Sequence, residues 1–172
     1  EMYGNQKKTL NEDSIFEPVS PYASAKLLAY WNTKIYRQAY GIFASNGIMF
    51  NHESSQRGEN FISKKTTKAV AEISLGLRDI LYVGNLNSYR DWGYAGDYVD
   101  AMWKIMQYKK PDDFVIATNK THSVRHFIEI AFKRVGIKII WKGKGIKEVG
   151  LEKKSKKILV KVDKIYFRPN EV

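Results

Sequence analysis

The chain has 172 residues, of which 44% are hydrophobic and 27% charged, an ordinary balance for a globular protein that excludes a disordered polyelectrolyte. It has no cysteine, which excludes disulfides, thiolate metal sites and a cysteine nucleophile. The net charge of +11 favours anionic partners, although a lysine-rich surface is the simpler explanation. No apolar run approaches the roughly 20 residues of a membrane span, so we expect no membrane partner.

The first third of the chain predicts a loop, a long helix and a buried strand. Residues 5–20 are polar and indicate a surface loop, and Pro21 then begins a helix that runs to about Tyr40. Proline suits the first helical turn because its missing N–H group is not needed there. Apolar residues recur near the helical period at Leu27, Leu28, Trp31, Ile35 and Ala39. The apolar run 42–50 predicts a buried strand, and 51–60 predicts a loop.

The rest of the chain alternates helical and strand patterns. In chain order these are a helix over 61–75, a strand over 80–83, a helix over 94–108, a strand over 114–117, a helix over 123–135, and strands over 137–141 and 158–162. Gly76 and Gly136 follow two of the helices, as glycines at helix ends commonly do. Because helix and strand alternate, we expect an α/β protein with parallel strands.

The strongest chemical signal is a tyrosine and a lysine near the start of the first helix. Tyr22 and Lys26 are four residues apart, so they share one helical face, one turn from each other. A neighbouring ammonium stabilises a phenolate, which allows a tyrosine to exchange a proton with a sugar hydroxyl. Such a pair is also common by chance, so the alternative is an accidental pair on a solvated helix.

Four short motifs follow along the chain, in this order: NHES at 51–54, RDWG at 90–93, DFVIAT at 113–118 and RPNEV at 168–172. Together with the Tyr22/Lys26 pair, they resemble the GDP-mannose 4,6-dehydratase family of the extended short-chain dehydrogenase/reductase superfamily. The pair is typical of the whole superfamily, whereas the four motifs are more specific. The resemblance covers nearly the whole chain and is weakest in the basic segment 142–157.

The resemblance implies an α/β fold: part of a Rossmann-type parallel sheet plus a smaller α/β substrate-binding lobe. Residues 1–60 and 94–118 would belong to the sheet part, and residues 61–93 and 119–172 to the sugar-nucleotide lobe. The sequence contains no glycine-rich strand–turn–helix motif for a nucleotide phosphate. We therefore interpret the chain as the C-terminal portion of a longer subunit. We expect the 172-residue chain alone to be catalytically inactive.

The resemblance also implies NADP-dependent dehydration of GDP-mannose to GDP-4-keto-6-deoxymannose in the cytoplasm. Tyr22 would be the base at the sugar 4-hydroxyl, and Lys26 would hold the nicotinamide ribose. Glu1 matches the acid/base carboxylate that acts at carbon 5. His52 and Arg57, together with the Tyr22/Lys26 pair, match the cofactor-binding positions.

Six residues match substrate-binding positions of the family: Asn51, Ile62, Lys65, Arg90, Arg168 and Glu171. The two arginines carry planar guanidinium groups that suit a diphosphate. For Lys65 the alternative is a solvated helix face, and Arg125 is a weaker candidate that could simply pair on its own helix. No metal site is expected.

The sequence also allows alternative functions. The charge of +11 motivates a nucleic-acid-binding module, although no recognisable motif accompanies it, so we expect no nucleic-acid partner. A non-catalytic partner domain that keeps the fold but has lost the cofactor half would also lack the glycine-rich segment. A dehydratase or epimerase for another nucleotide sugar would share the Tyr22/Lys26 pair. The family resemblance implies a homo-oligomer, and the stripe Leu27, Trp31 and Ile35 fits an oligomer interface or a core equally well.

Overall fold

The computed structural model describes residues 1–167 and divides into two compact units. The first unit comprises Glu1–Ser54 and Asp91–Lys120, and the second comprises Ser55–Arg90 and the described residues from Thr121 onward. The sequence places the divisions after residues 60, 93 and 118, whereas the structure divides after residues 54, 90 and 120. The roles expected of the two parts stay predictions. Arg168 and Glu171, both predicted substrate ligands, lie outside the described residues.

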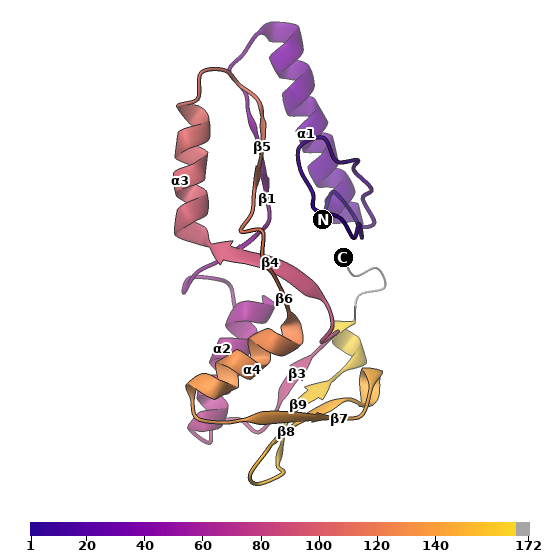
Figure 1. Ribbon diagram of the computed structural model, residues 1–172, viewed down its shortest axis with the longest axis vertical. Helices are drawn as coiled ribbons and strands as arrows, with labels where there is room; N and C mark the ends of the chain where they lie inside the picture. Colours follow the sequence, from indigo (N-terminus) through magenta and orange to yellow (C-terminus); the bar gives the residue numbers. More distant parts are fainter. Residues whose placement is uncertain (168–172) are drawn as a thin grey trace. The chain divides into compact units, whose positions relative to one another are not determined.

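The first unit contains a parallel pair of strands with a helix on either side. β1 (Asn46–Met49) pairs in parallel with β5 (Asp113–Ile116). Figure 1 shows α1 (Pro21–Tyr40) and α3 (Ala95–Met106) on opposite sides of this pair, and both helices contact β1. This helix–strand–helix layering is the arrangement expected of an α/β protein.

A second parallel pair in the first unit carries one of the predicted binding segments. β2 (Asn51–Glu53) pairs with β4 (Tyr89–Tyr94), which begins in the second unit and ends in the first. In the register of this pair, His52 lies opposite Gly93. The short segment that carries the predicted cofactor ligand His52 is therefore held by backbone pairing.

Helix α1 begins and ends at the residues that the sequence predicts. The N–H group of Ala23 donates to Oγ of Ser20 at 3.0 Å, which caps the helix, and Pro21 occupies the first turn. At the other end Gly41, with a φ of 63°, adopts the left-handed conformation and donates its N–H to the carbonyl of Arg37. Capping at both ends thus explains the bounds of the helix.

The apolar stripe predicted on α1 is only partly covered. The buried residues of the helix are Ala23 and Tyr30, and Leu27 is half-buried. Trp31 is 47% exposed and Ile35 is 53% exposed. Within the described residues, the stripe is therefore mostly surface rather than core.

Aromatic residues dominate the core of the first unit. Tyr3, Tyr30 and Ile48 are buried, and they pack against the partly buried Met2, Leu10, Phe16, Leu27, Phe50 and Val115. The ring of Phe16 lies between the two tyrosines, with centroid distances of 4.9 Å to Tyr3 and 4.8 Å to Tyr30. This core fastens the N-terminal segment to α1.

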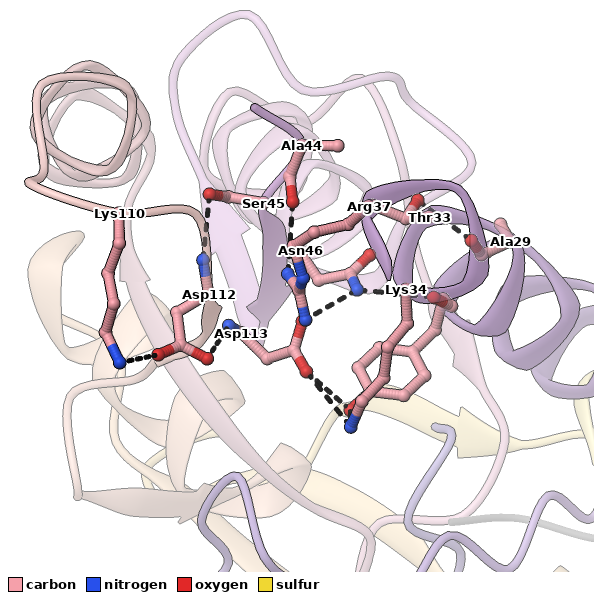
Figure 2. Close-up of polar contacts among 11 residues, drawn as sticks. Ala29, Thr33, Lys34, Arg37, Ala44, Ser45, Asn46, Lys110, Asp112 and Asp113 are labelled. Atoms are coloured by element: carbon pink, nitrogen blue, oxygen red, sulfur yellow. Dashed lines mark hydrogen bonds and ion pairs between the residues drawn. The ribbon is translucent and has the colours of Figure 1, made fainter. Parts of the chain in front are cut away.

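Asp113 joins α1 to the strand pair through a polar network (Figure 2). Its carboxylate accepts hydrogen bonds from Tyr30 at 2.9 Å, from Arg37 at 3.0 Å and from Asn46 at 2.9 Å. The ammonium of Lys34 lies 3.5 Å away. Burial would raise the pKa of Asp113, but the hydrogen bonds from Asn46, Tyr30 and Arg37 outweigh it and hold the pKa below its ordinary value.

The second unit contains a mixed sheet. Its strand order is β3 (Leu81–Val83), β9 (Ile158–Val162), β8 (Val149–Glu152) and β7 (Ile139–Lys142). β3 and β9 are parallel, whereas β8 is antiparallel to both of its neighbours. The expectation of parallel strands is thus correct for β1/β5, β2/β4 and β3/β9 and wrong for the β7–β8–β9 meander.

Two helices pack beside this sheet. α2 (Ile62–Ser74) and α4 (Val124–Arg134) contact each other, and they contact β3 and β7 respectively (Figure 1). The core between them is formed by the buried residues Ala69, Val70, Leu81, Val83, Ile128, Phe132, Leu159 and Val160. Shorter elements complete the unit: β6 (Thr121–Ser123), η1 (Gly145–Lys147) and η2 (Lys164–Tyr166). Among the helices of residues 1–167, none combines the length and apolar content that a membrane span requires.

The strand predicted over 42–50 is shorter in the structure, because its first residues are tied to the end of α1. The N–H of Ala44 donates to the carbonyl of Ile42 at 3.0 Å, and the guanidinium of Arg37 donates to the carbonyl of Ala44 at 3.0 Å. Ile42 and Phe43 are 46% and 45% exposed. Only Asn46–Met49 joins the strand ladder.

The sequence analysis missed the strands β2, β4, β6 and β8. β2 and β6 are three residues long, too short to show an alternating pattern. β4 carries Asp91 and Gly93, residue types that strands disfavour. β8 lies within the segment interpreted as a basic surface stretch, which is why the antiparallel meander was not foreseen.

Candidate active site

Tyr22 and Lys26 lie together on the first turns of α1. The two side chains are one helical turn apart. Tyr22 is 60% exposed, and Lys26 is exposed as well. The Ser20 cap and Pro21 fix the turn that carries the tyrosine. The structure therefore brings this predicted pair together and leaves both polar ends accessible to a ligand.

Glu1 lies just before a segment that packs into the same core as α1. Its side chain is exposed, and its backbone carbonyl accepts the N–H of Gly4 at 3.2 Å. Tyr3 is 3% exposed, and its hydroxyl donates to the carbonyl of Asn11 at 2.8 Å. The predicted carboxylate is thus attached to an ordered turn of the first unit.

Asn51 and His52 lie side by side in β2. Asn51 is exposed, whereas His52 is partly buried. Nδ1 of His52 lies 3.0 Å from the carbonyl oxygen of Phe50. The imidazole also stacks on the ring of Tyr98, with centroids 4.7 Å apart and planes inclined by 28°. The environment of His52 is therefore well defined on two sides.

Arg57 and Ile62 lie in the second unit, next to the start of α2. The guanidinium carbon of Arg57 is 3.5 Å from the centroid of the Phe61 ring, a cation–π contact. Phe61 occupies the N-cap position of α2 and makes no side-chain capping bond. The start of α2 therefore combines an arginine with the partial positive charge of a helix N-terminus.

Lys65 lies one turn into α2 and is half-buried against Tyr166. Its ammonium is 3.2 Å from the centroid of the Tyr166 ring. Burial, together with the charge of Arg78, lowers the pKa of Lys65, and Asp163 opposes the shift. The alternative of a freely solvated lysine face is therefore wrong for this residue.

The two remaining arginine candidates differ in their surroundings. Arg90 is partly buried in β4, and its Nη1 donates to the carbonyl of Tyr89 at 2.7 Å. Arg125 is paired within its own unit: its Nη2 lies 3.1 Å from Oε2 of Glu148 and 2.9 Å from Oδ1 of Asn87. Its guanidinium also stacks on Trp141 at 4.8 Å. This bonding identifies Arg125 as a structural residue.

Three aromatic residues that contact site candidates were missed: Phe61, Tyr98 and Tyr166. Tyr98 lies within the helix predicted over 94–108, and none of the motifs includes it. Tyr166 lies just before RPNEV, a stretch that carries the family resemblance. No sequence signal shows which of these rings a histidine or a cation contacts, because the partners are distant along the chain.

The chemistry of the candidate residues fits an anionic, hydroxyl-rich ligand. In the first unit a phenol, an ammonium, an amide and an imidazole offer donors and acceptors for sugar hydroxyls: Tyr22, Lys26, Asn51 and His52. In the second unit Arg57, Lys65 and Arg90 offer positive charge for phosphates. Within residues 1–167, no group of three or more histidine, aspartate or glutamate side chains is arranged to hold a metal ion.

Comparison with known proteins gives a consistent result. The family model described as GDP-mannose 4,6 dehydratase matches residues 1–172. The chain is 52% identical over 173 residues to the GDP-mannose 4,6 dehydratase of Dictyostelium discoideum and 53% identical to that of Sinorhizobium fredii. It is 50% identical to the human protein of that name. Each match covers 100% of this chain, but only 49%, 49% and 46% of the respective relatives. The chain thus spans about half the length of these relatives.

Solved structures share the fold at low sequence identity. A Pseudomonas aeruginosa protein, RMD, solved in complex with NADPH, has a TM-score of 0.78 at 18% identity, over 94% of this chain and 51% of that one. The dTDP-glucose 4,6-dehydratase of Bacillus anthracis, solved in complex with NAD, has a TM-score of 0.76 at 17% identity, over 99% of this chain and 48% of that one. These similarities confirm the α/β, Rossmann-type fold class.

Proposed function

Because the chain belongs to the GDP-mannose 4,6-dehydratase family, we propose that it is the C-terminal portion of a subunit that dehydrates GDP-mannose to GDP-4-keto-6-deoxymannose with NADP. The observation that carries this proposal is the exposed pair of Tyr22 and Lys26 on the capped first turns of α1. The relatives that share its sequence at about half of all positions are named for this activity.

The proposed chemistry assigns one proton transfer to each of two side chains. When bound, NADP would accept a hydride from carbon 4 and return it to carbon 6. Tyr22 takes the proton of the 4-hydroxyl through its phenolic oxygen, and the Lys26 ammonium stabilises the negative charge on that oxygen. Glu1 removes the proton at carbon 5, which the new 4-ketone acidifies, and passes it to the 6-hydroxyl, which leaves as water. The proton that Tyr22 took from the 4-hydroxyl balances the one added at carbon 5 when carbon 6 receives the hydride.

The proposed substrate site draws on the second unit. Lys65, near the start of α2, and the N–H groups of that helix N-terminus offer positive charge to an anionic nucleotide. Arg90 offers a planar guanidinium to the diphosphate. Ile62, Asn51 and, outside the described residues, Arg168 and Glu171 complete the set by their match to the family.

The proposed cofactor site uses Tyr22, Lys26, His52 and Arg57. Lys26 donates to ribose hydroxyls, and Arg57 supplies charge for a phosphate. His52 offers an imidazole whose orientation is set by Phe50 and Tyr98. We also propose that the intact protein is a homo-oligomer, which the half-exposed apolar stripe on α1 supports.

Substitution of Tyr22 tests the proposal. In the full-length protein, Tyr22→Phe should abolish turnover of GDP-mannose while leaving its affinity nearly unchanged, because the ring stays and only the proton-transfer group is lost. Tyr36→Phe, at another exposed tyrosine of α1, is the matched control and should retain turnover. Turnover of Tyr22→Phe within a few-fold of wild type would refute the catalytic assignment. Faster turnover of a different nucleotide sugar by the wild type would refute the assigned substrate.

A further inference from the structure

The imidazole of His52 is held by two contacts within the first unit. The ring of Tyr98 lies against one face, with centroids 4.7 Å apart. Nδ1 of His52 lies 3.0 Å from the carbonyl oxygen of Phe50. Because a carbonyl oxygen only accepts hydrogen bonds, Nδ1 carries the proton, and Nε2 is the acceptor of the neutral ring. The contacts therefore set both the plane and the tautomer of His52.

Tyr98 can reach His52 because the strand between them carries a glycine. Gly93 lies opposite His52 in the β2–β4 register. A Cβ atom at Gly93 would lie 2.4 Å from Cε2 of Tyr98 and 3.1 Å from Cγ2 of Thr118. Any side chain at this position would therefore displace the ring that supports His52.

Thr118, the other neighbour of Gly93, is held in place by Asp91. The buried carboxylate of Asp91, 5% exposed, accepts the N–H of Thr118 at 3.0 Å and its hydroxyl at 2.7 Å. The Tyr98 hydroxyl itself is buried and has no hydrogen-bond partner among residues 1–167. The contact with His52 therefore depends on the ring of Tyr98 and not on its hydroxyl.

We propose that Tyr98 is a positioning residue for cofactor binding, which holds the His52 imidazole in its binding orientation and whose ring occupies the space that Gly93 leaves free. This inference rests on the proposed cofactor role of His52. Tyr98 is 3% exposed, so it acts through the histidine and not by touching the cofactor. The two residues are 46 positions apart in the sequence, and only the fold brings them together.

The test is NADPH affinity, measured by cofactor fluorescence in the full-length protein. Tyr98→Leu removes the stacked ring and should weaken binding about tenfold, near the upper end of the range expected for loss of an aromatic pair. Tyr98→Phe keeps the ring and should restore affinity to within about twofold of wild type. GDP affinity, which depends on other residues, should be unchanged in both variants and shows that they are folded.

A second variant displaces the ring of Tyr98 without removing it. Gly93→Ala should displace Tyr98 and weaken NADPH binding as Tyr98→Leu does. Gly47→Ala is its matched control, because the atom nearest to a Cβ there is the mobile methyl end of Met49. Wild-type NADPH affinity in both Tyr98→Leu and Gly93→Ala would overturn the proposal, and so would equal losses in Tyr98→Leu and Tyr98→Phe.

A double-mutant cycle separates this inference from the proposed function. If Tyr98 acts through His52, adding Tyr98→Leu to His52→Ala should cause no further loss of NADPH affinity. If the double variant instead loses NADPH affinity by the product of the two single losses, the positioning role is refuted, while the cofactor role of His52 stays intact. Normal binding by His52→Ala would refute the cofactor role itself and the inference with it. In NMR spectra, the upfield ring-current shift of the His52 Cε1 proton should persist in Tyr98→Phe and disappear in Tyr98→Leu.

Discussion

At the scale of single residues, Asp113 shows how one carboxylate supports the proposed catalytic helix. It binds Tyr30, Lys34 and Arg37, which project from three successive turns of α1. The side chains of Asp113 and Arg37 are only 9% and 12% exposed, so this ion pair is poorly screened by solvent. The network thus fixes the position of the helix whose first turns carry Tyr22 and Lys26.

Loss of the Asp113 charge should destabilise the protein in a pH-dependent way. Because the folded-state pKa of Asp113 lies below its unfolded value, its contribution is complete above an unfolded pKa of about 3.9 and is lost as the pH falls through the folded pKa. Asp113→Asn should therefore cost about 3 kcal/mol near neutral pH, by leaving Arg37 and Lys34 without their carboxylate. The difference in thermal midpoint from wild type should shrink below about pH 4.

The control for this experiment is Asp13→Asn, at an exposed carboxylate of the N-terminal loop. Its thermal midpoint should match that of wild type across the same pH series. A constant difference between wild type and Asp113→Asn down to acidic pH would show that Asp113 contributes through its hydrogen-bond acceptors and not through its charge.

Arg90 allows a test of the proposed diphosphate site by protection. GDP should slow the modification of Arg90 and Arg168 by a guanidinium-directed reagent, because both side chains are assigned to the diphosphate. Peptide mapping by mass spectrometry would give the rate at each arginine. The exposed Arg134, at the end of α4, should be labelled at the same rate with and without GDP. Equal labelling of Arg90 in both conditions would contradict its assignment.

At the scale of elements, local sequence signals predicted the helices well and the short strands poorly. The bounds of α1 agree because Ser20, Pro21 and Gly41 are local capping signals. β9 also agrees, since five consecutive apolar or alternating residues at 158–162 suffice to indicate a strand. β2 and β4 depend instead on each other, and a pairing between residues about forty positions apart leaves no local pattern.

The candidate site shows the same division. The Tyr22/Lys26 pair follows from helical spacing alone, and the resemblance identified His52 and Lys65 from short motifs. The rings of Tyr98 and Tyr166, which contact these two residues, are distant in sequence and could not be paired with them beforehand. Sequence reasoning thus found the ligand-binding candidates but not the residues that support them.

The N-cap of α1 gives a prediction at this scale. Ser20→Ala removes the side-chain acceptor for the Ala23 N–H and should destabilise the protein by about 1 kcal/mol. Ser24→Ala, at an exposed position within the same helix, should be neutral or slightly stabilising because alanine is the better helix former. Thermal unfolding followed by circular dichroism would compare the two. Equal midpoints for both variants would show that Pro21 and packing define the helix start without the serine.

At the scale of the whole molecule, the 172-residue chain exposes surfaces that a Rossmann-type sheet usually covers. Among the described residues, β1 and β5 form a sheet of two parallel strands, and parallel sheets are normally buried on both faces. On α3, Val99 is 62% exposed and Trp103 is 66% exposed. Open strand edges beside such apolar surface favour self-association.

We therefore expect that the 172-residue chain, expressed alone, neither binds NADPH usefully nor stays monomeric. Dinucleotide affinity depends largely on a pyrophosphate held at a helix N-terminus behind a glycine-rich turn, a motif this sequence does not contain. Sedimentation should show concentration-dependent association, which Trp103→Glu on α3 should reduce. A fluorescence titration with NADPH should show no saturation at low micromolar concentration, whereas the full-length protein should saturate. Saturable binding by the isolated chain would show that Tyr22, Lys26, His52 and Arg57 suffice for the cofactor. The interpretation of the chain as a portion of a longer subunit that needs the rest to bind NADPH would then be wrong.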